Sequence, residues 1–185
     1  MSKVLISVIV TLLVLGAIGL IIVFSGVVNV AATEPDPGLV KWTFSTAMDN
    51  SVRYHAKDIA PPPLDDPKMI EEGFEHFNEM CVPCHGAPGV PRDEMGKGLN
   101  PFAPDLKEPV EEWSPAELFW ITKHGIKMTG MPAWGVTHSD EKIWAIVAFM
   151  RKLPSMSSDD YDKYVQRHSD EEGGEHEEEA DEHEH

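Results

Sequence analysis

The only two cysteines of this 185-residue chain lie three positions apart and are followed directly by a histidine. The motif is Cys81-Val82-Pro83-Cys84-His85. Two thiols at this spacing can add across the two vinyl groups of one haem, and the histidine can then bind the iron as an axial ligand. The motif therefore predicts one covalently bound haem c, attached through Cys81 and Cys84 and ligated by His85. A domain with this motif folds around a buried macrocycle.

Three other uses of two cysteines compete with haem attachment. A zinc site needs four ligands, and the chain has no second cysteine pair to complete one. A thiol–disulfide site is the stronger alternative, because a proline between the thiols suits that chemistry. Such a site follows a strand, however, whereas a helical pattern leads into Cys81. A structural disulfide would leave His85 without a role, so haem attachment is the interpretation that uses all three side chains.

A loop that reads KMTGMPAW begins at Lys127 and offers a second axial ligand, 46 residues after His85. A thioether is a soft, weak donor that favours ferrous iron and raises the haem potential. Met131 is the expected ligand, because Pro132 fixes the backbone directly after it. Met128 is the alternative, and it lies closer to the end of the preceding helix.

Two histidines flank the same loop and offer a different sixth ligand. His124 lies near the expected helix end and His138 follows the loop. A surface histidine is the simpler interpretation of both, and a position near a helix C-terminus also suits the helix dipole.

The residues from Asp66 to Pro154 are predicted to form a helical domain. A helix start is marked by Asp66-Pro67, and another by a capping box from Ser114 to Glu117. Gly125 is a typical helix end. No segment alternates as a strand would, so the fold class is all-α. The first helix carries an apolar stripe of Ile70, Phe74 and Phe77. The second contains the apolar run Leu118, Phe119, Trp120 and Ile121, and the third carries Ile143, Trp144, Val147 and Met150.

The run from Val4 to Phe24 contains no charged side chain. As a helix it spans roughly 30 Å, the thickness of the hydrocarbon core of a bilayer. Residues 1–32 are therefore predicted to be a membrane anchor with a single transmembrane helix at about 4–24. Lys3 before the run favours a cytoplasmic N-terminus, with the haem domain in the periplasm of a bacterial inner membrane. The alternative is a cleaved signal peptide with a small-residue site at 30–32, although signal cores are shorter than this run.

Residues 33–65 are predicted to be a periplasmic linker with a short amphipathic helix. Phe44, Met48, Val52 and His55 recur there at helical spacing. This helix could pack on the cytochrome domain, lie at the membrane surface or dock a neighbouring subunit.

Residues 155–185 are predicted to be an acidic, histidine-rich tail. One further helical turn is plausible around Tyr161, Tyr164 and Val165. Beyond it, residues 170–185 contain ten acidic side chains and no Lys or Arg, which predicts disorder. A solvated polyanion is the simplest interpretation, and weak metal binding is the alternative. The histidines concerned are His176, His183 and His185.

The net charge of −17 argues against nucleic acid as a partner, because phosphate binding needs a basic face. A protein partner with a basic docking patch fits this charge better.

Residues 66–154 resemble the class I cytochromes c, which are monohaem proteins with His/Met ligation. The most specific matching motifs are CVPCH and GMPAW, and the supporting ones are Gly73, Phe77, Pro104-Asp105-Leu106 and the final helix IWAIVAFMRKLP. The resemblance implies a fold in which the first and last helices cross closely at Gly73, with Trp144 or Phe149 nearby. It also implies that the carbonyl of Pro104 accepts a hydrogen bond from the His85 ring and orients it.

The whole chain is similar to membrane-anchored monohaem cytochromes found beside respiratory complexes. The resemblance implies a single-electron carrier rather than an enzyme. Its expected donor is a quinol-oxidising complex or a dehydrogenase, and its expected acceptor is an oxidase or a soluble carrier. Two alternatives remain: a haem enzyme with a displaceable sixth ligand (a peroxidase or nitrite-reducing centre), and a tethered thiol–disulfide protein.

Overall fold

The computed structural model describes the backbone of residues 2–181 and the side-chain surroundings of residues 2–169. The chain divides into two compact units, Met1–Pro35 and Asp36–His185. Over the described residues the chain is helical and has no strand, only an isolated bridge between Ala87 and Val90. The predicted all-α fold is confirmed.

The first unit consists mainly of the helix α1, Lys3–Phe24. The Ser2 side chain caps it by accepting a hydrogen bond from the Leu5 amide at 3.3 Å. Its apolar side chains are all exposed. Among the described residues, α1 is the one helix long and apolar enough to cross a membrane, and an export signal would pass the same test.

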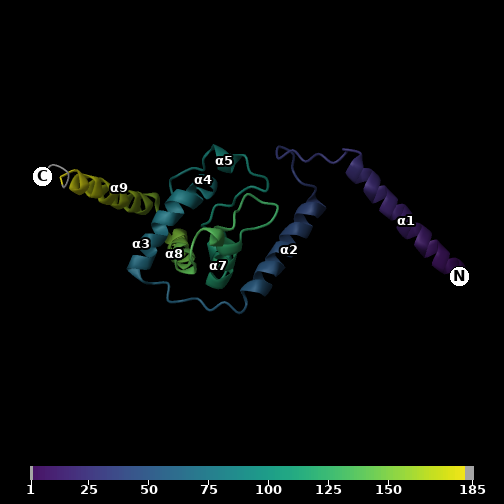
Figure 1. Ribbon diagram of the computed structural model, residues 1–185, viewed down its shortest axis with the longest axis horizontal. Coiled ribbons are helices and arrows are strands. Elements are labelled where there is room, and N and C mark those ends of the chain that lie inside the picture. Colours follow the sequence, from purple (N-terminus) through teal and green to yellow (C-terminus); the bar gives the residue numbers. More distant parts are fainter. Residues whose placement is uncertain (1, 182–185) are drawn as a thin grey trace. The chain divides into compact units, whose positions relative to one another are not determined.

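The core of the second unit is a crossing between α3, Pro67–His76, and α8, Asp140–Met150 (Figure 1). The helix that begins as α3 continues through a π-helical turn, η1, Phe77–Cys81, into α4, Val82–His85. The predicted start is correct, because the Asp66 side chain accepts a hydrogen bond from the Lys68 amide at 3.0 Å. Buried rings of Phe74, Phe77 and Phe149 fill the crossing.

Gly73 allows the two helices of this crossing to touch through their backbones. A Cβ atom at this position would overlap the carbonyl group of Ala145 and would lie 3.1 Å from the Cβ of Phe149. The close approach implied by the resemblance to class I cytochromes c is therefore present, with Phe149 beside it.

The helix α7, Pro115–His124, packs on the other side of α8 (Figure 1). Its capping box is formed as predicted: the Ser114 amide donates to the Glu117 carboxylate at 2.7 Å, and the Glu117 amide donates to the Ser114 hydroxyl at 3.4 Å. Phe119 of α7 stacks on Trp144 of α8 with ring centroids 4.1 Å apart.

The helix α2, Gly38–Ala56, packs on α7 (Figure 1). Only Val52 and Ala56 of α2 are fully buried. The His55 ring stacks on Trp120 of α7 at a centroid distance of 5.6 Å. This is the predicted short helix within residues 33–65, and its C-terminal part packs on the domain.

Short helical turns connect the long helices. They are α5, Glu94–Lys97; α6, Pro109–Glu112; η2, Trp134–Val136; and η3, Leu153–Ser155.

The last helix, α9, Ser158–Asp181, is longer than the single turn that the sequence predicts. Its beginning packs on α3: Tyr161 is buried against Phe74, and its hydroxyl donates to the Asn78 amide oxygen at 2.7 Å. His168 also stacks on Phe74, with a centroid distance of 4.8 Å. The helical backbone continues into the acidic segment, and the last four residues lie outside the described part of the chain.

Candidate haem site

Both cysteines of the motif lie at the end of the helix that begins as α3. Cys81 is the last residue of η1 and is buried, whereas Cys84 lies in α4 and is partly exposed. Neither thiol is in a disulfide. Residues three apart in a helix lie on one face, so one flat group can reach both thiols.

The α5 turn packs directly against this motif. A Cβ atom at Gly96 would lie 2.7 Å from the carbonyl oxygen of Pro83 and 2.8 Å from the Cα of Cys84. Glycine therefore allows a backbone-to-backbone contact here, and the contact holds α5 against the helical turn that carries the thiols.

His85 is oriented by the backbone of a distant loop. Its Nδ1 lies 2.8 Å from the carbonyl oxygen of Pro104, at the distance of a hydrogen bond. A carbonyl can only accept, so Nδ1 carries the proton and Nε2 keeps its lone pair. Burial lowers the pKa of His85 below its ordinary value, which favours the neutral imidazole that binds metals. Such a carbonyl partner is the usual support of a metal-ligating histidine.

Arg92 contacts the backbone of the same segment. Its Nε donates to the carbonyl oxygen of His85 at 3.4 Å, and its guanidinium lies 3.8 Å from the ring centroid of Phe102. The sequence analysis does not single out Arg92 or Phe102, because no spacing rule connects them to the motif.

The loop that carries Met131 is held at both of its ends. The Met131 amide donates to the Thr129 hydroxyl at 3.1 Å, and its carbonyl oxygen accepts from the Ile126 amide at 3.2 Å. Gly125 has a φ of +62°, and a Cβ there would lie 2.6 Å from the carbonyl carbon of Pro132. A glycine is therefore required where the end of α7 touches the methionine loop.

The two methionines of the loop differ in their surroundings. The Met131 side chain is partly buried. Met128 is 78% exposed and has a φ of +60°, a conformation typical of a loop tip.

The flanking histidines have other contacts. His124 is exposed, and its ring lies 5.1 Å from that of Trp120. His138 lies 2.8 Å from the Thr137 hydroxyl through its Nδ1, and its ring meets that of His76 edge-on at 5.4 Å. These contacts agree with the simpler interpretation that they are not iron ligands.

The structure does not describe the side chains of the three tail histidines. His183 and His185 lie outside the described residues, and the side-chain surroundings of His176 are not described. In the part of the chain that is described, no group of three or more His, Cys, Asp or Glu side chains could hold a metal ion.

These residues fit a covalently bound haem. Two free thiols lie three residues apart, and the next side chain is an imidazole whose Nδ1 is engaged and whose Nε2 is available. The donor set is complete for attachment and for one axial bond.

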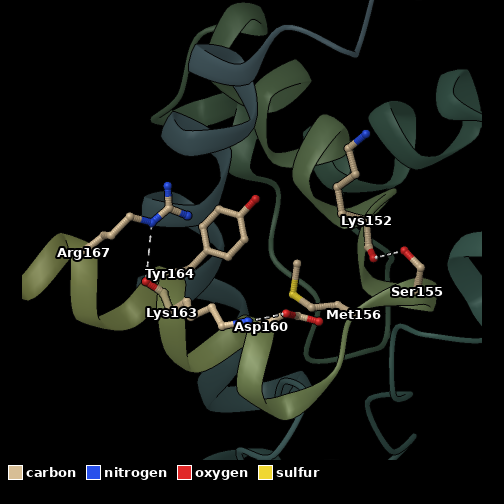
Figure 2. A pocket seen from close by; sticks show the side chains of 7 residues that line it. All are labelled: Lys152, Ser155, Met156, Asp160, Lys163, Tyr164 and Arg167. Carbon is tan, nitrogen blue, oxygen red and sulfur yellow. Dashed lines mark hydrogen bonds and ion pairs between the residues drawn. The ribbon is translucent and has the colours of Figure 1, made fainter.

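A surface pocket elsewhere on the domain is lined by residues of the segment that follows α8 and of the first turns of α9 (Figure 2). Three cations line it, and each pairs with a carboxylate: Lys163 with Asp160 at 2.9 Å, Lys152 with Asp65 at 3.6 Å, and Arg167 with Glu71 at 3.3 Å. The pocket includes no residue of the haem motif or the methionine loop.

An all-α domain built around one Cys-x-x-Cys-His motif, with its histidine held by a loop carbonyl, belongs to the class of c-type cytochromes. Residues 68–150 match a family model described as cytochrome c oxidase, cbb3-type, subunit III. The chain is a monohaem c-type cytochrome with a covalently bound haem c, and it functions in haem-based electron transfer. The match leaves α1, α2 and α9 outside it. No curated protein and no solved structure matches the chain.

Proposed function

We propose that this cytochrome is a membrane-anchored, single-electron carrier that works outside the cytoplasm with respiratory partners. The observation that carries the proposal is the 2.8 Å contact between His85 Nδ1 and the Pro104 carbonyl, next to two free thiols. In this proposal Cys81 and Cys84 attach the haem, His85 and Met131 are the axial ligands, and Pro104 orients the histidine ring. Haem c supplies reversible one-electron chemistry when bound.

The surroundings of the two methionines favour Met131 over Met128 as the sixth ligand. Met131 is partly buried, and its backbone is held by hydrogen bonds on both sides. A ligand must be kept at a fixed place at low entropic cost, whereas Met128 at the exposed loop tip would have to turn inward.

A carrier fits better than the alternative functions. Two protein ligands leave no iron position for a substrate, which disfavours a peroxidase or a nitrite-reducing centre. A thiol–disulfide protein needs a thiol of low pKa. Burial, together with the neighbouring Cys84, raises the pKa of Cys81 to about 12, which is the opposite of that requirement.

The apolar helix α1 supports the anchoring part of the proposal. Its 22 residues span a bilayer core, and Lys3 at its start favours a cytoplasmic N-terminus. The haem domain would then lie in the periplasm and diffuse in the plane of the membrane. A quinol-oxidising complex or a dehydrogenase would be the donor, and an oxidase or a soluble carrier the acceptor. The family description, which names an oxidase subunit, supports a respiratory partner.

The axial ligand is tested with the variants Met131→Ala and Met128→Ala in the full-length holoprotein. In the oxidised state, Met131→Ala should lose the sulfur-to-iron charge-transfer band, and the iron should become high-spin and bind cyanide rapidly. Met128→Ala is the matched control, from the same loop, and should keep the spectrum of the parent protein.

The same spectra contain the results that contradict the proposal. Loss of the band only in Met128→Ala would assign the bond to Met128. An unchanged spectrum in both variants would exclude a methionine of this loop. A pyridine haemochrome assay confirms that each sample carries covalent haem, so failed maturation is not mistaken for a lost ligand.

A further inference from the structure

The helix α2 exposes large apolar side chains that the cytochrome domain does not cover. Leu39 is 74% exposed, Trp42 63%, Phe44 54% and Tyr54 64%. Only the C-terminal part of α2 is buried on α7, through Val52 and Ala56.

The face of α2 that points away from α7 has no charged side chain. With 3.6 residues per turn, the residues opposite Val52 and Ala56 form one continuous strip along the helix. We call this strip the α2 outer face, and it comprises Leu39, Val40, Thr43, Phe44, Ala47, Asn50, Ser51 and Tyr54.

The charges within α2 lie outside this face, and Lys57, directly after the helix, lies over the ring of Tyr54 with its Nζ 4.4 Å from the centroid. Arg53 lies over the ring of Trp113 at 5.5 Å, and Asp49 is partly buried. Lys41 is exposed on the side of the helix that carries Val52. In a chain of net charge −17, residues 37–48 contain no acidic side chain at all.

The position of α2 along the chain limits what can cover this face. Only residues 25–37 separate the end of α1 from the start of α2. A fully extended segment of this length reaches roughly 45 Å, so α2 cannot move far from any membrane that α1 spans. Tyrosine, which Tyr54 contributes to this face, is enriched in the headgroup region of bilayers, and helices that lie there bury an apolar face.

We propose that the α2 outer face lies in the headgroup region of the bilayer that α1 spans. The inference rests on the membrane anchor of the proposed function. Lipid is favoured over a protein partner, because a partner selected by the acidic character of this chain would meet acidic side chains, and this face has none. The charge beside it is the basic Lys57, over the Tyr54 ring, which suits anionic headgroups. The contact restricts the rotation of the haem domain relative to the membrane, so the same side of the domain stays turned towards membrane-bound redox partners.

The test uses the full-length holoprotein in proteoliposomes, with one nitroxide label per variant. Haem attachment consumes Cys81 and Cys84, so an introduced cysteine is the only reactive thiol. Thr43→Cys places the label on the outer face, and Lys41→Cys places the matched control on the opposite side of the same helix, about 160° away around its axis. Leu20→Cys reports separately on α1.

The measurement is the relaxation of each label by oxygen, which partitions into lipid, and by a water-soluble nickel chelate. If α2 lies on the bilayer, the oxygen-to-nickel ratio at position 43 should be several-fold higher than at position 41. The label at position 20 should show a high ratio in either case, if the anchor is inserted.

Three results would overturn the inference, and they are distinguishable. Equal ratios at positions 43 and 41, with position 20 in lipid, would reject the outer-face contact and leave the anchor intact. A low ratio at position 20 would reject the anchor and the contact that depends on it. A label at position 43 shielded from both reagents would mean that protein, not lipid, covers the face.

Discussion

Two helix contacts in this cytochrome are built in different ways. Where α3 crosses α8, Gly73 lets the backbones touch, and every side chain of α8 from Ala145 to Met150 is buried. Where α2 meets α7, only Val52 and Ala56 are buried, and the contact is completed by rings at its edge. The first contact has no space for an added side-chain atom at Gly73, whereas the second leaves most of α2 uncovered by the domain.

The difference separates the part of the chain that forms the haem domain from a part that is added to it. The α3–α8 crossing lies almost entirely within residues 68–150, which match the family, and α2 lies outside them. Local stability follows the amount of buried apolar contact. We therefore expect α3 and α8 to unfold only with the whole domain and α2 to detach on its own.

The largest effect is expected when the haem cannot be attached. In the double variant Cys81→Ala/Cys84→Ala, the α3–α8 crossing should lose its fixed packing, because a domain of this size has a small core of its own. Near-UV circular dichroism of the parent holoprotein and the variant measures this loss, since the rings of Phe74, Phe77 and Phe149 pack at the crossing. A variant that keeps the near-UV signal would show that the helices pack without the haem.

A smaller but still large effect is expected for Gly73→Ala. The added Cβ meets the carbonyl group of Ala145, so α3 and α8 must separate, at a cost of about 3 kcal/mol in the free energy of unfolding. Denaturant unfolding followed by haem absorbance measures the change. Gly98→Ala is the matched control, because its nearest neighbours would be 3.7 Å away and its φ of −89° suits any residue. Equal stability of the two variants would contradict the close crossing.

Much of the α3–α8 region could be predicted from the sequence, because local chemistry determines it. The cap at Asp66, the capping box at Ser114 and the end of α7 at Gly125 are formed as predicted. The Pro104 carbonyl also lies where the resemblance to class I cytochromes c places it. The haem-ligating roles of His85 and Met131 remain predictions that the spectra must test.

The positions of α2 and α9 were harder to predict, because they depend on contacts between residues far apart in sequence. Tyr161 fits a helical turn by spacing, but its burial depends on Phe74 and Asn78, more than eighty residues earlier. Likewise, the stripe on α2 indicated a helix without indicating which of its residues α7 would cover. Helical periodicity predicts a face and does not identify its partner.

The smallest effect on global stability is expected for Val52→Ala in α2. Val147→Ala in α8 provides the direct comparison. Both side chains are essentially inaccessible, with 1% and 0% exposure, and both substitutions to alanine remove the same two methyl groups. Val147→Ala in α8 should lower the free energy of global unfolding by about 2 kcal/mol. Val52→Ala in α2 should lower it by less than about 0.5 kcal/mol, because α2 can detach before the domain unfolds. Its effect should appear instead as faster hydrogen exchange confined to α2, with an unchanged haem spectrum. If both variants lost the same global stability, α2 would unfold together with the haem domain, and the distinction between the two contacts would be wrong.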